Sequence, residues 1–226
     1  DGKYRLILKT DAETLSLCSL SYERLGDADE KPVAELSYDM KLWASFNDWS
    51  GQDMQRNGDD LIWWCEADVP AGGGEFGIKN AAMDGWYSSE NNSKNIVLEE
   101  GHYMFFIELE VVDGKPVLKD EIIAEEPAYY VVGTCGNAGW AADANAENTA
   151  YKMTEQDSKY VLTVTFTEDE TVDWAENKVA FKVAYGCGGK VANENWFGAE
   201  GMDNVTVDPG TYTITFDPAT GAVTVE

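Results

Sequence analysis

The chain has 226 residues, of which 44% are hydrophobic and 12% aromatic, which is enough apolar side chain to build a packed core. Its 16 Lys and Arg residues face 42 Asp and Glu, so the formal net charge is −26. A charge of that sign repels phosphate backbones and anionic lipid surfaces, and no apolar run reaches the length of a membrane span. We therefore expect no nucleic-acid partner and no membrane insertion, whereas a neutral sugar meets no such repulsion.

The first predicted element is a β-hairpin at the N-terminus. Residues 3–9 and 15–18 have a strand-like pattern, and residues 10–14 between them have the composition of a turn. Because the sequence opens inside a strand, we expect it to be a fragment of a longer secreted protein. This hairpin either ends an upstream repeat or is an extra hairpin of the first module, and the sequence leaves both alternatives open.

The rest of the chain is an internal repeat with four anchors in the same order twice. Each copy has a tryptophan just after an apolar strand, a strand with a phenylalanine, a second tryptophan and a closing hairpin. The paired anchors, first copy before second, are Trp49 and Trp140, Phe76 and Phe181, Trp86 and Trp196, and residues 95–103 and 204–212. Repetition of short alternating strands predicts an all-β fold of two tandem antiparallel β-sandwich modules, immunoglobulin-like in kind.

The boundary between the modules is placed near Glu125, in a charged segment that ends at Pro127. This divides the chain into residues 1–125, which include the extra N-terminal hairpin, and residues 126–226. Because the linker is short, we expect the modules to touch rather than tumble freely.

The eight tryptophans carry most of the functional signal. Side chains alternate between the two faces of a strand, so Trp63 and Trp64 cannot both point inward. We assign Trp43 and one of that pair to the core, where indoles bury a large apolar area.

Four other tryptophans stand in loop-like stretches rich in Asn, Asp, Gly and Ser: Trp49, Trp86, Trp140 and Trp196. An indole in a polar loop exposes apolar surface unless something covers it. A pyranose ring has an apolar face that fits a flat indole, and its hydroxyls reach the polar groups around the rim. The alternative is that these indoles fold back onto the end of the sandwich.

Two lysines fit the same plan through strand alternation. Lys79 follows Phe76 by three residues and Lys182 follows Phe181 by one. Both offsets are odd, so both lysines should face away from the core, on the strand that leads to the second tryptophan. An ammonium group offers three donors on a flexible stem, which suits sugar oxygens, although a lysine that only improves solubility is the alternative.

Enzymatic and metal-binding interpretations find less support. A Ser/His or Cys/His catalytic pair would have to use His102, the only histidine, whose counterpart in the other copy is Thr211. The acidic segments 27–30 and 59–60 lack the spacing of a calcium-binding loop, and residues 72–74 lack the lysine and helix of a phosphate loop. The sequence therefore predicts no catalytic residue, no metal site and no cofactor.

None of the four cysteines lies in a CxxC motif, which disfavours a zinc site. Cys135 and Cys187 stand in glycine-rich stretches and would be able to pair in an oxidising compartment. Cys18 and Cys65 stand in strand-like runs, which suits buried thiols. The sequence does not decide whether either pair forms a disulfide.

The order of anchors in the second copy resembles that of the starch-binding repeats of the SusE/SusF type and of similar modules in amylases and starch-adhesion proteins of gut bacteria. The resemblance covers most of residues 127–226 and, more loosely, residues 38–120. It is carried by segments 129–133, 139–140, 181–183, 196–198, 204–207 and 210–212.

The resemblance implies binding of starch or malto-oligosaccharides, without catalysis, by a monomeric part of a larger multidomain protein outside a bacterial cell or on its surface. It implies one site made by Trp140, Trp196 and Lys182 and another made by Trp49, Trp86 and Lys79. The first copy departs from the pattern, because residues 42–45 replace the Val-Gly that follows the leading strand and the N-terminal hairpin has no counterpart.

Three rival functions remain open from the sequence, of which an enzyme that uses paired carboxylates is the least favoured. The other two are binding functions. One is a structural or protein-binding adhesion module, in which the tryptophans would be hot spots for a protein partner. The other is a module that binds a different glycan, because the shape of an aromatic platform depends on loop geometry. Whether the ligand is starch or another glycan, two weak sites in linked modules would bind the same polymer chain together and gain affinity through avidity.

Overall fold

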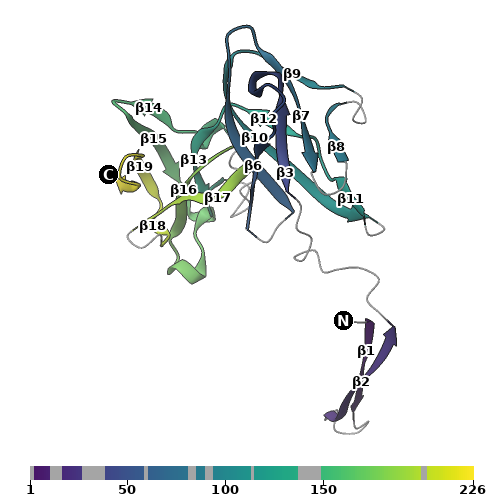
Figure 1. Ribbon diagram of the computed structural model, residues 1–226. Helices are drawn as coiled ribbons and strands as arrows, with labels where there is room; N and C mark the ends of the chain where they lie inside the picture. Colours follow the sequence, from purple (N-terminus) through teal and green to yellow (C-terminus); the bar gives the residue numbers. More distant parts are fainter. Residues whose placement is uncertain are drawn as a thin grey trace.

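The structure is a computed structural model, and it describes residues 3–10, 17–26, 39–58, 61–80, 85–89, 94–112, 115–136, 149–199 and 203–226 (Figure 1). Four antiparallel sheets form two β-sandwich modules, which confirms the predicted all-β fold. The helical elements whose bounds the structure defines are short 3-10 turns at 45–47, 149–151, 168–170 and 173–175. No helix in those ranges has the length and hydrophobicity needed to cross a membrane.

The N-terminal hairpin is a sheet of two strands. β1 (Lys3–Thr10) pairs antiparallel with β2 (Leu17–Gly26), as the alternating pattern predicts.

The first module has two sheets of five strands each. One sheet contains β3 (Met40–Ala44), β4 (Gln52–Asp53), β7 (Gly74–Asn80), β8 (Gly85–Tyr87) and β9 (Ile96–Leu98). The other contains β5 (Gln55–Arg56), β6 (Ile62–Val69), β10 (Gly101–Val112), β11 (Lys115–Leu118) and β12 (Ile123–Glu125).

The second module has two sheets of four strands each. One sheet contains β13 (Ala128–Gly133), β16 (Val179–Cys187), β17 (Lys190–Phe197) and β18 (Val205–Val207). The other contains β14 (Thr154–Gln156), β15 (Lys159–Phe166), β19 (Gly210–Asp217) and β20 (Ala222–Val225).

The two modules share one pattern of strand pairing. In the first, β7 pairs with β3, β8 and β9, and in the second β16 pairs with β13, β17 and β18. The register also agrees, because Phe76 lies opposite Ala44 and Phe181 lies opposite Gly133 at the end of the leading strand. The repeat seen in the sequence is therefore a repeat of topology, and the two phenylalanines are equivalent.

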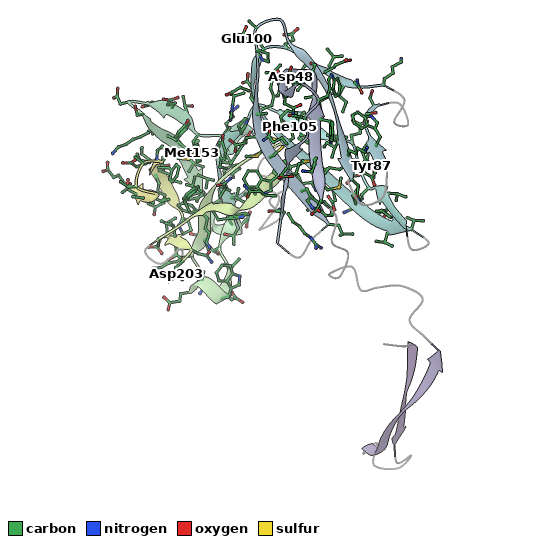
Figure 2. All side chains as sticks on the ribbon, viewed as in Figure 1. Asp48, Tyr87, Glu100, Phe105, Met153 and Asp203 are labelled. Carbon is green, nitrogen blue, oxygen red and sulfur yellow. The ribbon has the colours of Figure 1, made fainter. Side chains whose placement is uncertain are left out.

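The core of each module lies between its two sheets and is rich in aromatic rings. Figure 2 shows Phe105 inside the first module, where its ring meets that of Phe76 edge-on at 4.9 Å between centroids. In the second module, Phe166 and Phe181 lie 5.5 Å apart. Aromatic pairs at these distances stabilise the core beyond the burial of their apolar area, because the rings attract each other in preferred relative orientations.

Alternation along the strands decides which tryptophans enter the core. Trp63 is 1% exposed in the core and Trp64 is half-buried on the opposite face of β6, so the prediction that one of the pair is core is confirmed. The assignment of Trp43 to the core is wrong. Its neighbours Leu42 and Ala44 are the buried residues of β3, and alternation turns Trp43 to the outer face.

The three cysteines whose side chains the structure describes are buried thiols in separate places. Cys65 lies in the core of the first module, as predicted, and burial raises its pKa to about 12. Cys135 lies in the core of the second module, whereas Cys187 ends strand β16 in a different cluster, so the Cys135–Cys187 disulfide does not form in this structure. The side chain of Cys18 lies outside the described residues.

Candidate functional site

Three tryptophans gather on the outer face of the sheet formed by β3, β7 and β8. The indole rings of Trp49 and Trp86 lie 6.4 Å apart between centroids, at 39° to one another. On the same face the Nζ atom of Lys79 lies 5.8 Å from the centroid of the Trp43 ring, a cation–π distance. We call Trp43, Trp49, Trp86 and Lys79 the first aromatic face.

Strand pairing brings these side chains together. Lys79 pairs with Trp86 across β7 and β8, and Trp43 pairs with Gly77 across β3 and β7. Trp43, Lys79 and Trp86 alternate with residues whose side chains fill the core, so these three point outward. Trp49 joins them from the loop that follows β3.

Two glycines let the indoles lie close to the sheet. A Cβ atom on Gly77 would come within 2.3 Å of Cζ2 of Trp86, and one on Gly51 within 2.8 Å of Cε2 of Trp43. Each indole therefore crosses a position that has no side chain. Gly51 also has a φ of +75°, a conformation that glycine adopts without strain.

Trp49 is presented by a tight loop that follows β3. The side chain of Asn47 accepts a hydrogen bond from the backbone of Ala44 at 3.0 Å and donates one to Leu42 at 3.1 Å. The backbone N–H of Trp49 donates to the carbonyl of Ala44 at 2.9 Å.

Asp48 and Trp49 both have a left-handed backbone, with φ of 55° and 53°. This conformation costs energy in residues other than glycine, and such strain is concentrated at functional sites. The strained loop leaves the Trp49 side chain at the surface, 36% exposed.

This arrangement is suited to binding an apolar ring face. Trp43, Trp86 and Lys79 are half-buried, which holds their orientation, while part of each side chain is open to solvent. Indole faces offer flat contact area, and the ammonium group of Lys79 offers donors at the edge of that area. Alternation along β3 divides its residues into two sets, but nothing in the sequence of residues 42–46 marks which set points outward, so the sequence did not identify Trp43 as part of the face.

The second module places two of its three predicted site residues on the equivalent sheet. Trp196 pairs with Ala184, as Trp86 pairs with Lys79, so the two tryptophans occupy equivalent positions. The indole of Trp196 packs against a cluster of small and aromatic residues: Ala128, Tyr130, Val132, Ala184 and Val191. Trp140 lies outside the described residues.

The two lysines do not occupy equivalent positions. Lys182 lies opposite Val132, in the place that Gly77 takes in the first module, and the equivalent of Lys79 is Ala184. A lysine where the first module has glycine leaves no room for an indole to cross at that point. The outward direction predicted for both lysines agrees with the register, but the shape of the two faces differs.

Sequence reasoning gave no role to Trp174, which is 59% exposed. It lies in the 3-10 turn Asp173–Ala175, on the loop between β15 and β16. The loop is tied to the end of β13, because Glu170 accepts a hydrogen bond from the backbone of Gly136 at 2.6 Å and one from the hydroxyl of Tyr151 at 3.1 Å.

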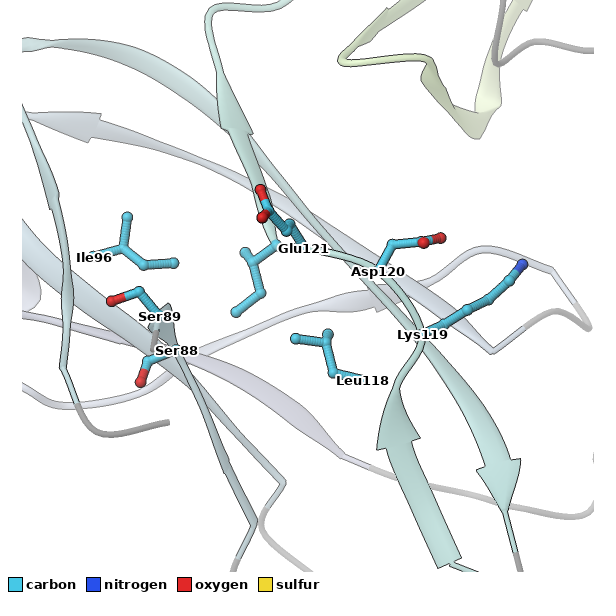
Figure 3. A pocket seen from close by; sticks show the side chains of 8 residues that line it. Ser88, Ser89, Ile96, Leu118, Lys119, Asp120 and Glu121 are labelled. Carbon is cyan, nitrogen blue, oxygen red and sulfur yellow. The ribbon is translucent and has the colours of Figure 1, made fainter. Parts of the chain in front are cut away.

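A groove at the edge of the first sandwich lies apart from the predicted site residues (Figure 3). It opens between the segment after β8 and the segment that joins β11 to β12. Its lining consists of Ser88, Ser89, Ile96, Leu118, Lys119, Asp120, Glu121 and Ile122. None of these eight residues is aromatic, so the part of the groove that the structure describes lacks the flat apolar walls of the first aromatic face.

His102 lies on β10 between two carboxylates of β6. Its Nδ1 atom is 2.7 Å from Asp68 and its Nε2 atom 3.2 Å from Glu66. The hydrogen bond with Asp68 raises the pKa of His102 above its usual 6.5, burial opposes this shift, and Glu66 adds to it. Among the described residues, no group of three or more His, Cys, Asp or Glu side chains is arranged to hold a metal ion.

We expect His102 to stabilise the fold in acid more than in base. A folded-state pKa above the unfolded value adds stability that is complete below pH 6.5 and is lost as the pH rises through the raised pKa. His102→Thr, the residue of the other copy, should therefore lower the urea midpoint more at pH 5.5 than at pH 8.5. An equal loss at both pH values would contradict this role for the imidazolium.

Comparison with solved structures finds a likeness in fold. No protein-family model and no curated protein sequence matches the chain. In structure it is similar to SusF from Bacteroides thetaiotaomicron, with a TM-score of 0.38 and 12% identity over 92% of this chain and 49% of that one. The chain thus spans about half the length of SusF.

Proposed function

We propose that the protein binds a neutral polysaccharide, without acting on it chemically, through its aromatic faces. The observation that carries the proposal is the first aromatic face, where Trp49 and Trp86 lie 6.4 Å apart beside Trp43 and Lys79. We include Trp140, Trp196 and Lys182 as the second site. The resemblance of the sequence to SusE/SusF-type starch-binding repeats makes starch or malto-oligosaccharide the preferred ligand and an extracellular or cell-surface location the expected one.

The chemistry of the face supports a sugar over a charged ligand. Indole rings bind the C–H face of a pyranose by burying apolar area, and the ammonium of Lys79 can donate to its hydroxyls. The chain carries a net charge of −26, which disfavours anionic polymers. A protein hot spot is the competing function, because exposed tryptophans also anchor protein interfaces.

Titration calorimetry with maltoheptaose tests the proposal, with cellohexaose as the β-linked comparison. We expect heat with maltoheptaose and retardation of the protein in native gels that contain soluble starch. Heat with cellohexaose alone would keep glycan binding but replace the α-glucan. No heat and no retardation with any glucan would contradict the proposal and favour a protein partner.

A separate assay tests the absence of catalysis. Purified protein incubated with soluble starch should release no reducing sugar above a buffer blank. Release that grows with protein concentration would contradict the non-catalytic part of the proposal.

A further inference from the structure

The two modules meet through an apolar cluster of side chains from both. Met104 and Phe106 of β10 and Cys187 and Ala192 of the second module are all at most 1% exposed. Four half-buried residues pack around them, namely Ile62, Trp64, Ile123 and Tyr185. We call these eight residues the interface cluster.

Polar contacts join the same two surfaces. The side-chain amide of Asn57 donates to the carbonyl of Val191 at 3.1 Å, and the thiol of Cys187 donates to the carbonyl of Met104 at 3.5 Å. Both contacts are buried, so breaking them would lose these hydrogen bonds where water does not readily replace them.

Glu108 of β10 receives one lysine from each module. Lys190 of the second module donates to its Oε2 atom at 2.6 Å, and Lys119 of the first module donates to its Oε1 atom. Burial alone would raise the pKa of Glu108, but hydrogen bonds from Lys119 and Lys190 lower it. Glu108 and Lys190 are largely shielded from solvent, with side chains 14% and 18% exposed, so water and salt screen their attraction less than that of a surface ion pair, and removing one partner leaves the other charge poorly solvated.

The docking surface is specific to the first module. Since His102 and Thr211 are equivalent, Met104 and Phe106 correspond to Thr213 and Thr215 in the second module. On that sheet Thr163 and Thr213 approach each other to 3.4 Å at the surface, and Thr165 and Thr211 to 2.8 Å. Equivalent positions are thus apolar where they are covered by the partner module and polar where they face water, as expected for a built interface.

From this contrast we infer that the interface cluster and the Lys190–Glu108 pair hold the two modules as one rigid unit. The relative orientation of the two aromatic faces is then fixed, and the protein favours long glycan chains that reach both. This second part rests on the proposed function. A fixed orientation raises the effective concentration of the second site, and gains of about 10²–10⁴ are typical of linked sites whose geometry allows simultaneous binding.

Two charge-reversal variants distinguish a change in the relative orientation of the modules from a change in charge next to Glu108. Lys190→Glu repels Glu108 across the interface, while Lys119→Glu removes the other partner of the same carboxylate within the first module. Residual dipolar couplings of the unliganded wild type should fit one alignment tensor for both modules. Lys190→Glu should require two tensors, and Lys119→Glu should still fit one. Two tensors for the wild type would overturn the inference.

Glycan binding by the same variants tests the functional part. Lys190→Glu should lose at least about tenfold in affinity for long amylose while its affinity for maltotriose stays within about twofold. Lys119→Glu should match the wild type with both ligands. Equal losses of affinity for long amylose in the two variants would overturn the inference that the contact between the modules supports binding at both sites. If the wild type binds no glucan at all, the proposed function fails, whereas the alignment tensors still decide whether the unit is rigid.

Discussion

Replacing Trp86 by alanine should weaken binding of malto-oligosaccharide to the first module by about thirtyfold. Truncating a central aromatic anchor costs about 2 kcal/mol or more, and each 1.4 kcal/mol changes the dissociation constant by about tenfold. Trp86 is the central residue here, since its ring lies 6.4 Å from that of Trp49 and its pairing partner is Lys79. Calorimetry of Trp86→Ala in a Trp196→Ala background isolates this site from that of the second module.

Trp174 provides the matched control for this measurement. It is an exposed tryptophan on a loop of the second module and no part of the first aromatic face. Trp174→Ala in the same background should leave the affinity unchanged within the error of the titration. Equal losses for Trp86→Ala and Trp174→Ala would mean that exposed indoles act nonspecifically, and the first aromatic face would not be the site.

Replacing Trp63 by alanine should lower the free energy of unfolding by about 3–5 kcal/mol, the range for deletion of a large aromatic side chain from a core. Trp63 is 1% exposed and lies among the core residues of the first module. The cavity left by the indole would be lined by other core side chains, which relax only partly into such a space. Urea unfolding followed by circular dichroism gives the difference.

Trp64 is the neighbouring control, because it has the same side chain on the opposite face of β6. It is half-buried in the interface cluster rather than in a core. We expect Trp64→Ala to cost less than Trp63→Ala and to loosen the contact between modules. A larger loss for Trp64→Ala would contradict the assignment of Trp63 as the core residue.

The position of Trp43 shows where sequence reasoning about this fold reached its limit. A tryptophan in an apolar strand is typical of a core, and residues 42–46 contain no charged side chain that would mark an outer face. Only the buried side chains of Leu42 and Ala44 show which set of alternate residues points inward. The inward-facing set of β3 is therefore shifted by one residue from the expected set, and Trp43 lies on the first aromatic face instead of in the core.

The two site lysines illustrate the same limit in pairing register. Counting residues from Phe76 and Phe181 predicted the outward direction of Lys79 and Lys182. Their positions along the sheet depend on which residues lie opposite them on neighbouring strands, and these are Trp86 for Lys79 and Val132 for Lys182. A single sequence contains the strands but not their register.

The sequence by itself determined the all-β class, the duplication and the equivalence of Phe76 with Phe181, because alternation and turn residues act locally and repeat in the same order. Tertiary structure alone decided that Cys135 and Cys187 stay apart, that Trp43 joins Trp86 at the surface, and that β10 of the first module is a docking face. These features depend on contacts between residues far apart in the chain. Glu108 and Lys190 are separated by 82 positions, and only the packing of two sheets from different modules brings them to 2.6 Å.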